Sequence, residues 1–128
     1  MPTHLTTQAE SWNGVEIVFA AGEIDLSTAP RLGQALEAAL TPGASSVADL
    51  SRVDFIDSAG THTLALADRA AAAHGGRLLI VASEAVSHVL AVTGLDRAFQ
   101  VYDELREALA AAGGEGHPVH ANGDADPA

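Results

Sequence analysis

Residues 49–60 read DLSRVDFIDSAG, and this stretch decides how the chain folds. The apolar residues from Val47 to Leu50 predict the end of a buried strand, followed by a short polar loop, an apolar pair and a helix. Ser58 stands where that helix begins, and its hydroxyl could cap the helix by accepting a hydrogen bond from a first-turn N–H group. A phosphate on the same hydroxyl would lie where the helix dipole favours negative charge. The pattern therefore permits a helix cap, a phosphorylation switch, or both, at Ser58.

The segments on either side of this stretch alternate between strand and helix patterns. Asn13-Gly14 is a hairpin turn signal between a loose strand pattern at residues 4–10 and a stronger one at residues 15–21. Further strand patterns cover residues 46–50, 77–82 and 99–102, and helical patterns cover residues 30–40, 59–74, 84–92 and 103–112. We therefore predict one α/β domain over residues 1–112, with about four helices and a mixed sheet of four to five strands, an N-terminal hairpin plus parallel strands.

Local signals also predict how the helices begin and which side chains they bury. Ser27 or Thr28 can cap the first helix, and Ser83 can cap the third. In the helix predicted over residues 59–74, Asp68 and Arg69 should point outward, and five apolar residues are spaced for burial: Leu64, Ala65, Ala67, Ala71 and Ala72. The isolated Trp12 is expected to cover the end of the hairpin.

Composition and charge narrow the classes of function. The formal net charge is −11, all six basic residues are Arg, and cysteine is absent. A strongly acidic surface repels phosphate backbones and anionic lipids, so we expect neither nucleic-acid nor membrane binding, and a basic protein partner fits better. Without cysteine there is no disulfide or thiolate zinc site. No apolar run approaches the roughly 20 residues of a membrane helix, which favours a soluble, cytoplasmic protein.

The composition changes after residue 112. Residues 113–128 are rich in Gly, Pro and acidic side chains and offer almost nothing to bury, so we predict a disordered C-terminal tail. His117 and His120 lie in this tail, but two histidines without an ordered partner make a weak metal site, and we expect no metal. No Walker-type loop or dinucleotide fingerprint is present, and we expect no cofactor.

Three blocks of the sequence together resemble a STAS domain over about residues 3–112. They are Gly22-Glu23-Ile24-Asp25, the stretch 49–60, and Gly75-Gly76-Arg77-Leu78. More narrowly, the chain is similar to single-domain bacterial anti-sigma factor antagonists. That resemblance implies a protein without enzymatic activity that binds an anti-sigma factor/serine kinase and releases a sigma factor for transcription, as in stress responses. It also implies that phosphorylation of the motif serine ends the binding and that a PP2C-type phosphatase restores it.

The resemblance assigns roles to residues of this chain. It makes Ser58 the phosphorylation site, and it implies a partner-binding surface around this serine, formed by Asp25, Asp57, Ser58, Ala59, Gly60, Thr61 and His62. Three positions depart from the family pattern. Ala59 replaces a second hydroxyl residue, Thr61 replaces the usual Leu, and His62 adds a further polar group to the first turn, where an apolar or very small residue is usual. The oligomeric state expected for such a module is a monomer or a weak dimer.

Other interpretations of the same residues remain. The chain could be a STAS-fold scaffold or ligand-sensing module without a phosphorylation switch, either binding a small anion or nucleotide at the Ser58 helix or serving as a subunit of a lipid-transport assembly. A hydrolase-like catalytic triad is another interpretation, formed by Asp57, Ser58 and His62. The absence of a Gly-x-Ser-x-Gly elbow argues against that enzyme. Asp25 and Asp57 as an acid/base pair are similarly disfavoured, because loop carboxylates usually cap helices or are solvated.

Overall fold

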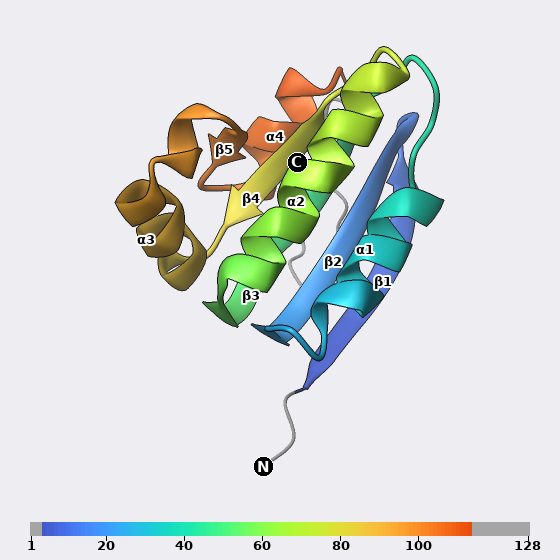
Figure 1. Ribbon diagram of the computed structural model, residues 1–128. Coiled ribbons are helices and arrows are strands. Elements are labelled where there is room, and N and C mark those ends of the chain that lie inside the picture. Colours follow the sequence, from blue (N-terminus) through green and yellow to red (C-terminus); the bar gives the residue numbers. More distant parts are fainter. Residues whose placement is uncertain (1–3, 114–128) are drawn as a thin grey trace, which may run out of the picture.

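An antiparallel hairpin begins the fold of the computed structural model, which describes residues 4–113. It joins β1 (Leu5–Trp12) to β2 (Val15–Ile24), as Figure 1 shows. Asn13 and Gly14 both have positive φ, of 49° and 82°, which confirms the predicted two-residue turn. The described residues contain only the first residue of the predicted disordered tail, and residues 114–128 lie outside them.

Three parallel strands extend the sheet from β2. They are β3 (Ser46–Ile56), β4 (Leu78–Ala82) and β5 (Gln100–Tyr102), and the spatial order of the strands is β1-β2-β3-β4-β5. Each of the pairs β2·β3, β3·β4 and β4·β5 is parallel. The predicted mixed sheet is therefore confirmed. Parallel neighbours bring the carboxyl ends of β2 and β3 to the same edge of the sheet, where loops can meet.

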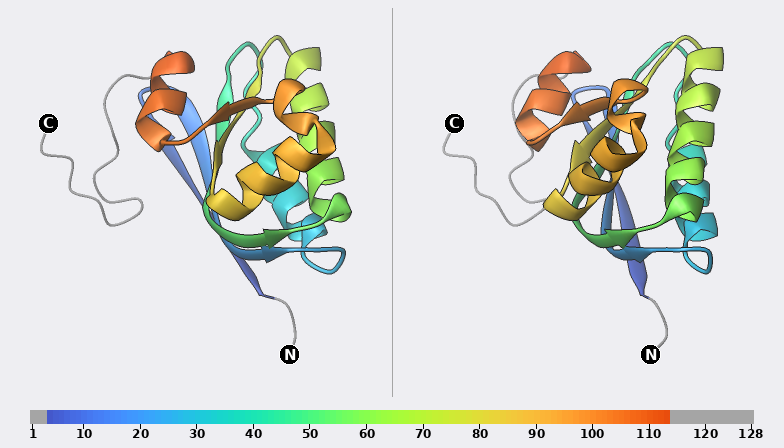
Figure 2. Two further views of the ribbon diagram at one scale, coloured as in Figure 1. Left: turned by 90° about the vertical axis from the view of Figure 1, so that its left-hand side faces the viewer. Right: turned by 60° about the vertical axis from the view of Figure 1, so that its left-hand side comes forward.

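The helices cover the two faces of the sheet unequally. One apolar core lies between the sheet and three helices, α1 (Ala29–Ala38), α2 (Ser58–Ala73) and α3 (Glu84–Thr93). A short 3₁₀ turn (Leu95–Arg97) follows α3, and a second core lies on the opposite face under α4 (Leu105–Ala111). The two views of Figure 2 show α4 separated from α1 and α2 by the sheet. The partly buried Trp12 packs in this second core.

β3 differs from the prediction, because it continues through the residues expected to form a polar loop. Val53 and Ile56 are buried in the main core, while Arg52, just before Val53, and Asp54, just after it, are exposed. The register against β2 shifts where β3 passes Leu50, and the buried Asp49 carboxylate accepts the N–H of Ser51 at 2.9 Å there. A carboxylate that accepts the backbone N–H of the residue two positions later can stabilise such a shift in strand register.

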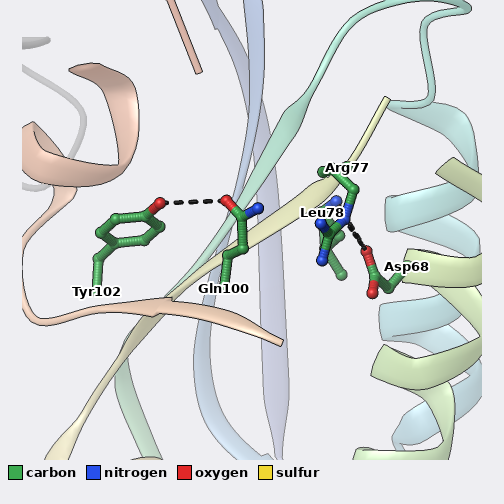
Figure 3. A network of polar contacts seen from close by, with 5 residues as sticks. All are labelled: Asp68, Arg77, Leu78, Gln100 and Tyr102. Atoms are coloured by element: carbon green, nitrogen blue, oxygen red, sulfur yellow. Dashed lines mark hydrogen bonds and ion pairs between the residues drawn. The ribbon is translucent and has the colours of Figure 1, made fainter. Parts of the chain in front are cut away.

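Two polar side chains near the helices also differ from expectation. The Thr28 hydroxyl does not cap α1 but donates to the Glu23 carbonyl at 2.8 Å. Asp68 of α2 does not point outward. Its side chain is 17% exposed and accepts the N–H of Leu78 at 3.1 Å and Nε of Arg77 at 3.4 Å, as Figure 3 shows. Asp68 thereby fastens α2 to the start of β4.

Among the other local predictions, some are confirmed and one is wrong. Ser83 caps α3 by accepting the N–H of Val86 at 3.1 Å, as predicted, and Gly94 ends that helix in the left-handed region. Ala72 was expected to be buried in α2 but is exposed, whereas Leu64 and Ala71 are buried. In β5, the Tyr102 hydroxyl donates to the Gln100 side chain at 3.2 Å (Figure 3).

Candidate functional site

The first turn of α2 is capped by Asp57 and not by Ser58. Oδ1 of Asp57 accepts the N–H of Ala59 at 2.9 Å and the N–H of Gly60 at 3.2 Å. Of the interpretations that the sequence permits for Ser58, the helix cap is therefore wrong. Ser58 is instead the first residue of the helix, and it is exposed. Since the carboxylate beside it performs the capping, the serine hydroxyl is left at the surface for other chemistry.

Gly60 allows the start of α2 to lie directly on the ends of two strands. A Cβ at this position would lie 2.6 Å from Cγ1 of Ile56 and 2.7 Å from Cγ2 of Ile24, which is closer than atoms can pack. Both isoleucines belong to the main core. Gly60 is itself buried, so its close approach is to the sheet, and it acts on the site by fixing the position of Ser58.

Thr61 is also directed into the fold. It is 8% exposed, and its hydroxyl donates to the carbonyl of Ser58 at 3.1 Å. The hydroxyl thus finds an acceptor within the first turn of α2, which explains how a polar side chain is buried at this position. The structure therefore places Gly60 and Thr61 behind the surface that carries Ser58, where they can act only by positioning it.

The remaining predicted residues lie at or near the surface. His62 is exposed one turn after Ser58, and Ala59 is half-buried against the main core. Asp25 is half-buried in the loop between β2 and α1, where its Oδ1 accepts the N–H of Ser27 at 2.9 Å and that of Thr28 at 3.1 Å. Asp25 and Asp57 thus both hold loop backbone through their carboxylates. This use accounts for both residues without acid/base chemistry.

A backbone contact joins the two loops at this edge of the sheet. The N–H of Asp57 donates to the carbonyl of Ile24 at 3.1 Å, so the residue before Ser58 is bonded to the residue before Asp25. Glu23 and Asp54 are exposed in the same two strand ends. The surroundings of the serine are therefore acidic, which makes a further negative charge at Ser58 unfavourable there.

Two exposed apolar side chains near this edge were missed by sequence reasoning. Leu26 follows Asp25 in the loop before α1 and is 80% exposed, and Phe55 near the end of β3 is 48% exposed. Large exposed apolar groups beside a polar site are typical of protein interfaces. The only signal in the sequence was a leucine placed within an otherwise polar loop, between Asp25 and Ser27.

The described part of the chain offers little support for other kinds of site. Residues 4–113 contain no group of three or more His, Asp or Glu side chains that could hold a metal ion. Among the same residues, no helix is long and apolar enough to cross a membrane. The Asp57 carboxylate, which a hydrolase triad would need to orient His62, is engaged as the helix cap.

Comparisons with known proteins agree with this architecture. The STAS domain model matches residues 6–108. The chain is 28% identical to the anti-sigma-F factor antagonist RsfB of Mycobacterium tuberculosis over 109 residues, which are 84% of this chain and 89% of that protein.

Solved structures give the same result. An anti-sigma factor antagonist from Mycobacterium paratuberculosis is 37% identical, with a TM-score of 0.77, and the match covers 85% of this chain and 94% of that one. A sulfate transporter family protein from Wolinella succinogenes is 28% identical, with a TM-score of 0.68 and coverage of 78% and 85%. The chain belongs to the STAS domain family.

Proposed function

We propose that this protein is an anti-sigma factor antagonist that is switched by phosphorylation of Ser58. In its unmodified form it binds an anti-sigma factor that is also a serine kinase, and a sigma factor is released. The kinase then phosphorylates Ser58 and the complex dissociates, until a PP2C-type phosphatase removes the phosphate. The reactions take place in the bacterial cytoplasm, and this chain is the substrate in both of them.

The observation that carries the proposal is the position of Ser58. Its hydroxyl is exposed at the first residue of α2, and the capping that it could have provided is supplied by Asp57. A kinase can therefore reach the hydroxyl without opening the helix. The names of the similar proteins, both anti-sigma factor antagonists, support the choice of partner.

Electrostatics explains how one phosphate could end the binding. A phosphoserine carries roughly −1.5 to −2 charges at neutral pH. It would stand beside Asp57 and near the Asp25 loop, on a chain whose net charge is already −11. A loss of about 3 kcal/mol at the centre of an interface lowers affinity by about two powers of ten. The same phosphate also takes up space against any partner packed on the small serine.

The contact surface in this proposal extends beyond the acidic loops. Leu26 is the apolar side chain with the greatest exposure among the large hydrophobic residues described, and it lies in the loop bonded to Asp57 through Ile24. An apolar anchor surrounded by carboxylates fits a partner that offers an apolar pocket with a basic rim. Ser58 and His62 would form the part of this surface contributed by α2.

Intact-mass spectrometry tests the proposal. The full chain is incubated with ATP, Mg²⁺ and each candidate anti-sigma kinase from its own genome, beside Ser58→Ala and the control Ser51→Ala, which removes an exposed hydroxyl of β3. We expect one phosphate on the wild type and on Ser51→Ala and none on Ser58→Ala. If no kinase that is active on another substrate modifies the wild type, the phosphorylation switch is excluded.

The similarity to a sulfate transporter family protein gives the alternative some weight. In that alternative the chain is a scaffold or ligand-sensing module of STAS fold, and Ser58 is only a surface residue. The same experiment separates the two, since only the antagonist requires a kinase that modifies Ser58. A scaffold would instead show no added phosphate after incubation with any of the kinases.

A further inference from the structure

Ser58 and His62 both lie on the exposed side of α2. Both residues are exposed, and they are four positions apart in one continuous helix. Side chains at this spacing lie about 5–6 Å apart at their Cβ atoms and can interact directly. An acidic group that precedes a basic one by four residues is also the more favourable order in a helix. A phosphate on Ser58 would therefore have an imidazole within reach.

The capping contacts restrict where such a phosphate can find hydrogen bonds. Oδ1 of Asp57 already accepts the N–H groups of Ala59 and Gly60, which are donors that a helix N-terminus would otherwise offer to an anion. Asp57 also adds a negative charge next to the phosphate. A basic side chain nearby is therefore the protein group best able to stabilise the phosphate.

The arginines of the surrounding elements are directed elsewhere or lie far away. Nη1 of Arg31 in α1 donates to a carbonyl of β1 at 3.4 Å. Arg52 of β3 lines a cavity on the α4 side of the sheet, together with Phe19 and Asp49. Arg69 follows Ser58 by eleven residues, which is about 16 Å along the helix axis at 1.5 Å per residue. His62 is thus the basic side chain of α2 within one turn of Ser58.

The other charged groups near α2 are mostly acidic. The elements packed against α2 are α1, β3 and β4, and its first turn also lies on the end of β2, which carries the exposed Glu23. Their charged side chains are Arg31 and Glu37 of α1 and Asp49, Arg52 and Asp54 of β3, while β4 has none. Glu37 lines the groove between α1 and α2. Its neighbours there, Leu66 and Ala70, lie two to three helical turns after Ser58. The loops add Asp25 and Asp57.

We propose that His62 binds the phosphate of phosphorylated Ser58 and holds it along the exposed side of α2. This inference rests on the proposed function for its biological role, since the kinase would create the phosphate. The contact makes His62 a positioning residue of the phosphorylated state. A phosphoserine ordinarily loses its second proton near pH 6, and a basic side chain in contact with the phosphate favours the dianion over the monoanion.

Phosphorus-31 NMR of the full chain tests the contact directly. Phosphoserine is incorporated genetically at position 58, and the second pKa of the phosphate is measured by titration in the wild type and in His62→Gln. We expect this pKa to be about half a unit lower with His62 present, from an exposed helical ion pair with a doubly charged partner. His62→Arg should also lower it, and His88→Gln, which changes an exposed histidine of α3, should match the wild type.

An identical phosphate pKa in the wild type and in His62→Gln would overturn the inference. Because the phosphoserine is introduced genetically, this result does not depend on any kinase. If no kinase modifies Ser58, the proposed function is contradicted, but the measured contact between His62 and the phosphate is unaffected.

Discussion

The N–H of Asp57 donates to the carbonyl of Ile24 at 3.1 Å, and this bond joins the two loops that carry the candidate site. It links the last residue before α2 to the last residue of β2, so Ser58 and the Asp25 loop are held at one edge of the sheet. The site is therefore built by the parallel pairing of β2 with β3 and by the way α2 lies upon their ends.

The close packing at Gly60 should make this position intolerant of a side chain. Gly60→Ala places a Cβ against β-branched core residues that have little freedom to move, and we expect a loss of about 1–3 kcal/mol in the free energy of unfolding. The measurement is urea denaturation of the unphosphorylated chain. Gly33→Ala in α1 is the control, because its Cβ would meet Thr63 at 3.4 Å, and it should be neutral or slightly stabilising. Equal effects of the two substitutions would contradict the packing described.

Substitutions of Asp57 and Ser58 should differ clearly in their effect on the free energy of unfolding. Asp57→Ala removes the acceptor of two first-turn N–H groups and should cost about 1 kcal/mol of unfolding free energy. Ser58→Ala removes no cap and should change it by less than about 0.5 kcal/mol. Thermal or urea unfolding compares the two, with Asp54→Ala as a control for loss of an exposed carboxylate. A larger cost for Ser58→Ala than for Asp57→Ala would show that the serine is the true cap.

The contact between Asp68 and β4 should matter more for its backbone bond than for its ion pair. Asp68→Ala leaves the N–H of Leu78 without its acceptor and should cost about 1–3 kcal/mol. Arg77→Ala removes only a partner at 3.4 Å whose side chain is 42% exposed, and it should cost well under about 1 kcal/mol. Urea denaturation at low and high salt measures both. A large, salt-sensitive loss in Arg77→Ala would assign the stability to the ion pair instead.

Leu26 should act as an apolar anchor for the partner. Leu26→Asp is expected to weaken binding to the anti-sigma factor at least about tenfold without loss of stability, because the side chain is 80% exposed in the free chain. Val92→Asp is the matched control, since Val92 is 72% exposed on α3, outside the two loops of the site. Isothermal titration calorimetry measures both affinities. Equal weakening by the two variants would place the contact surface elsewhere.

Much of the fold was predictable because its signals are local. The Asn13-Gly14 turn and the Ser83 cap of α3 need only neighbouring residues to be recognised, and the structure confirms both. The length of β3 could not be predicted, because beyond Leu50 this strand pairs with β2 alone, and its exposed polar residues are also typical of a loop. Whether they form a strand depends on how far β2 extends, which is a long-range property.

The sequence located the helix start that carries the candidate residues, but it did not predict what each of their side chains contacts. Asp57 and Ser58 are both good capping residues, and the choice between them depends on where β3 ends and α2 begins. Thr61 is polar in composition but buried, because its hydroxyl finds the carbonyl of Ser58 within the same turn. Neither the exposure of Leu26 nor the acceptor role of Asp68 follows from helical periodicity.

The most direct test of the switch is the affinity of the anti-sigma kinase for two forms of the full chain. One form carries a genetically encoded phosphoserine at position 58, and the other is unmodified, with Ser58→Ala as a control for loss of the hydroxyl alone. We expect the phosphorylated form to bind at least about a hundredfold more weakly, and Ser58→Ala to bind within a few-fold of the wild type. Equal affinity of the phosphorylated and unmodified chains would contradict the switch.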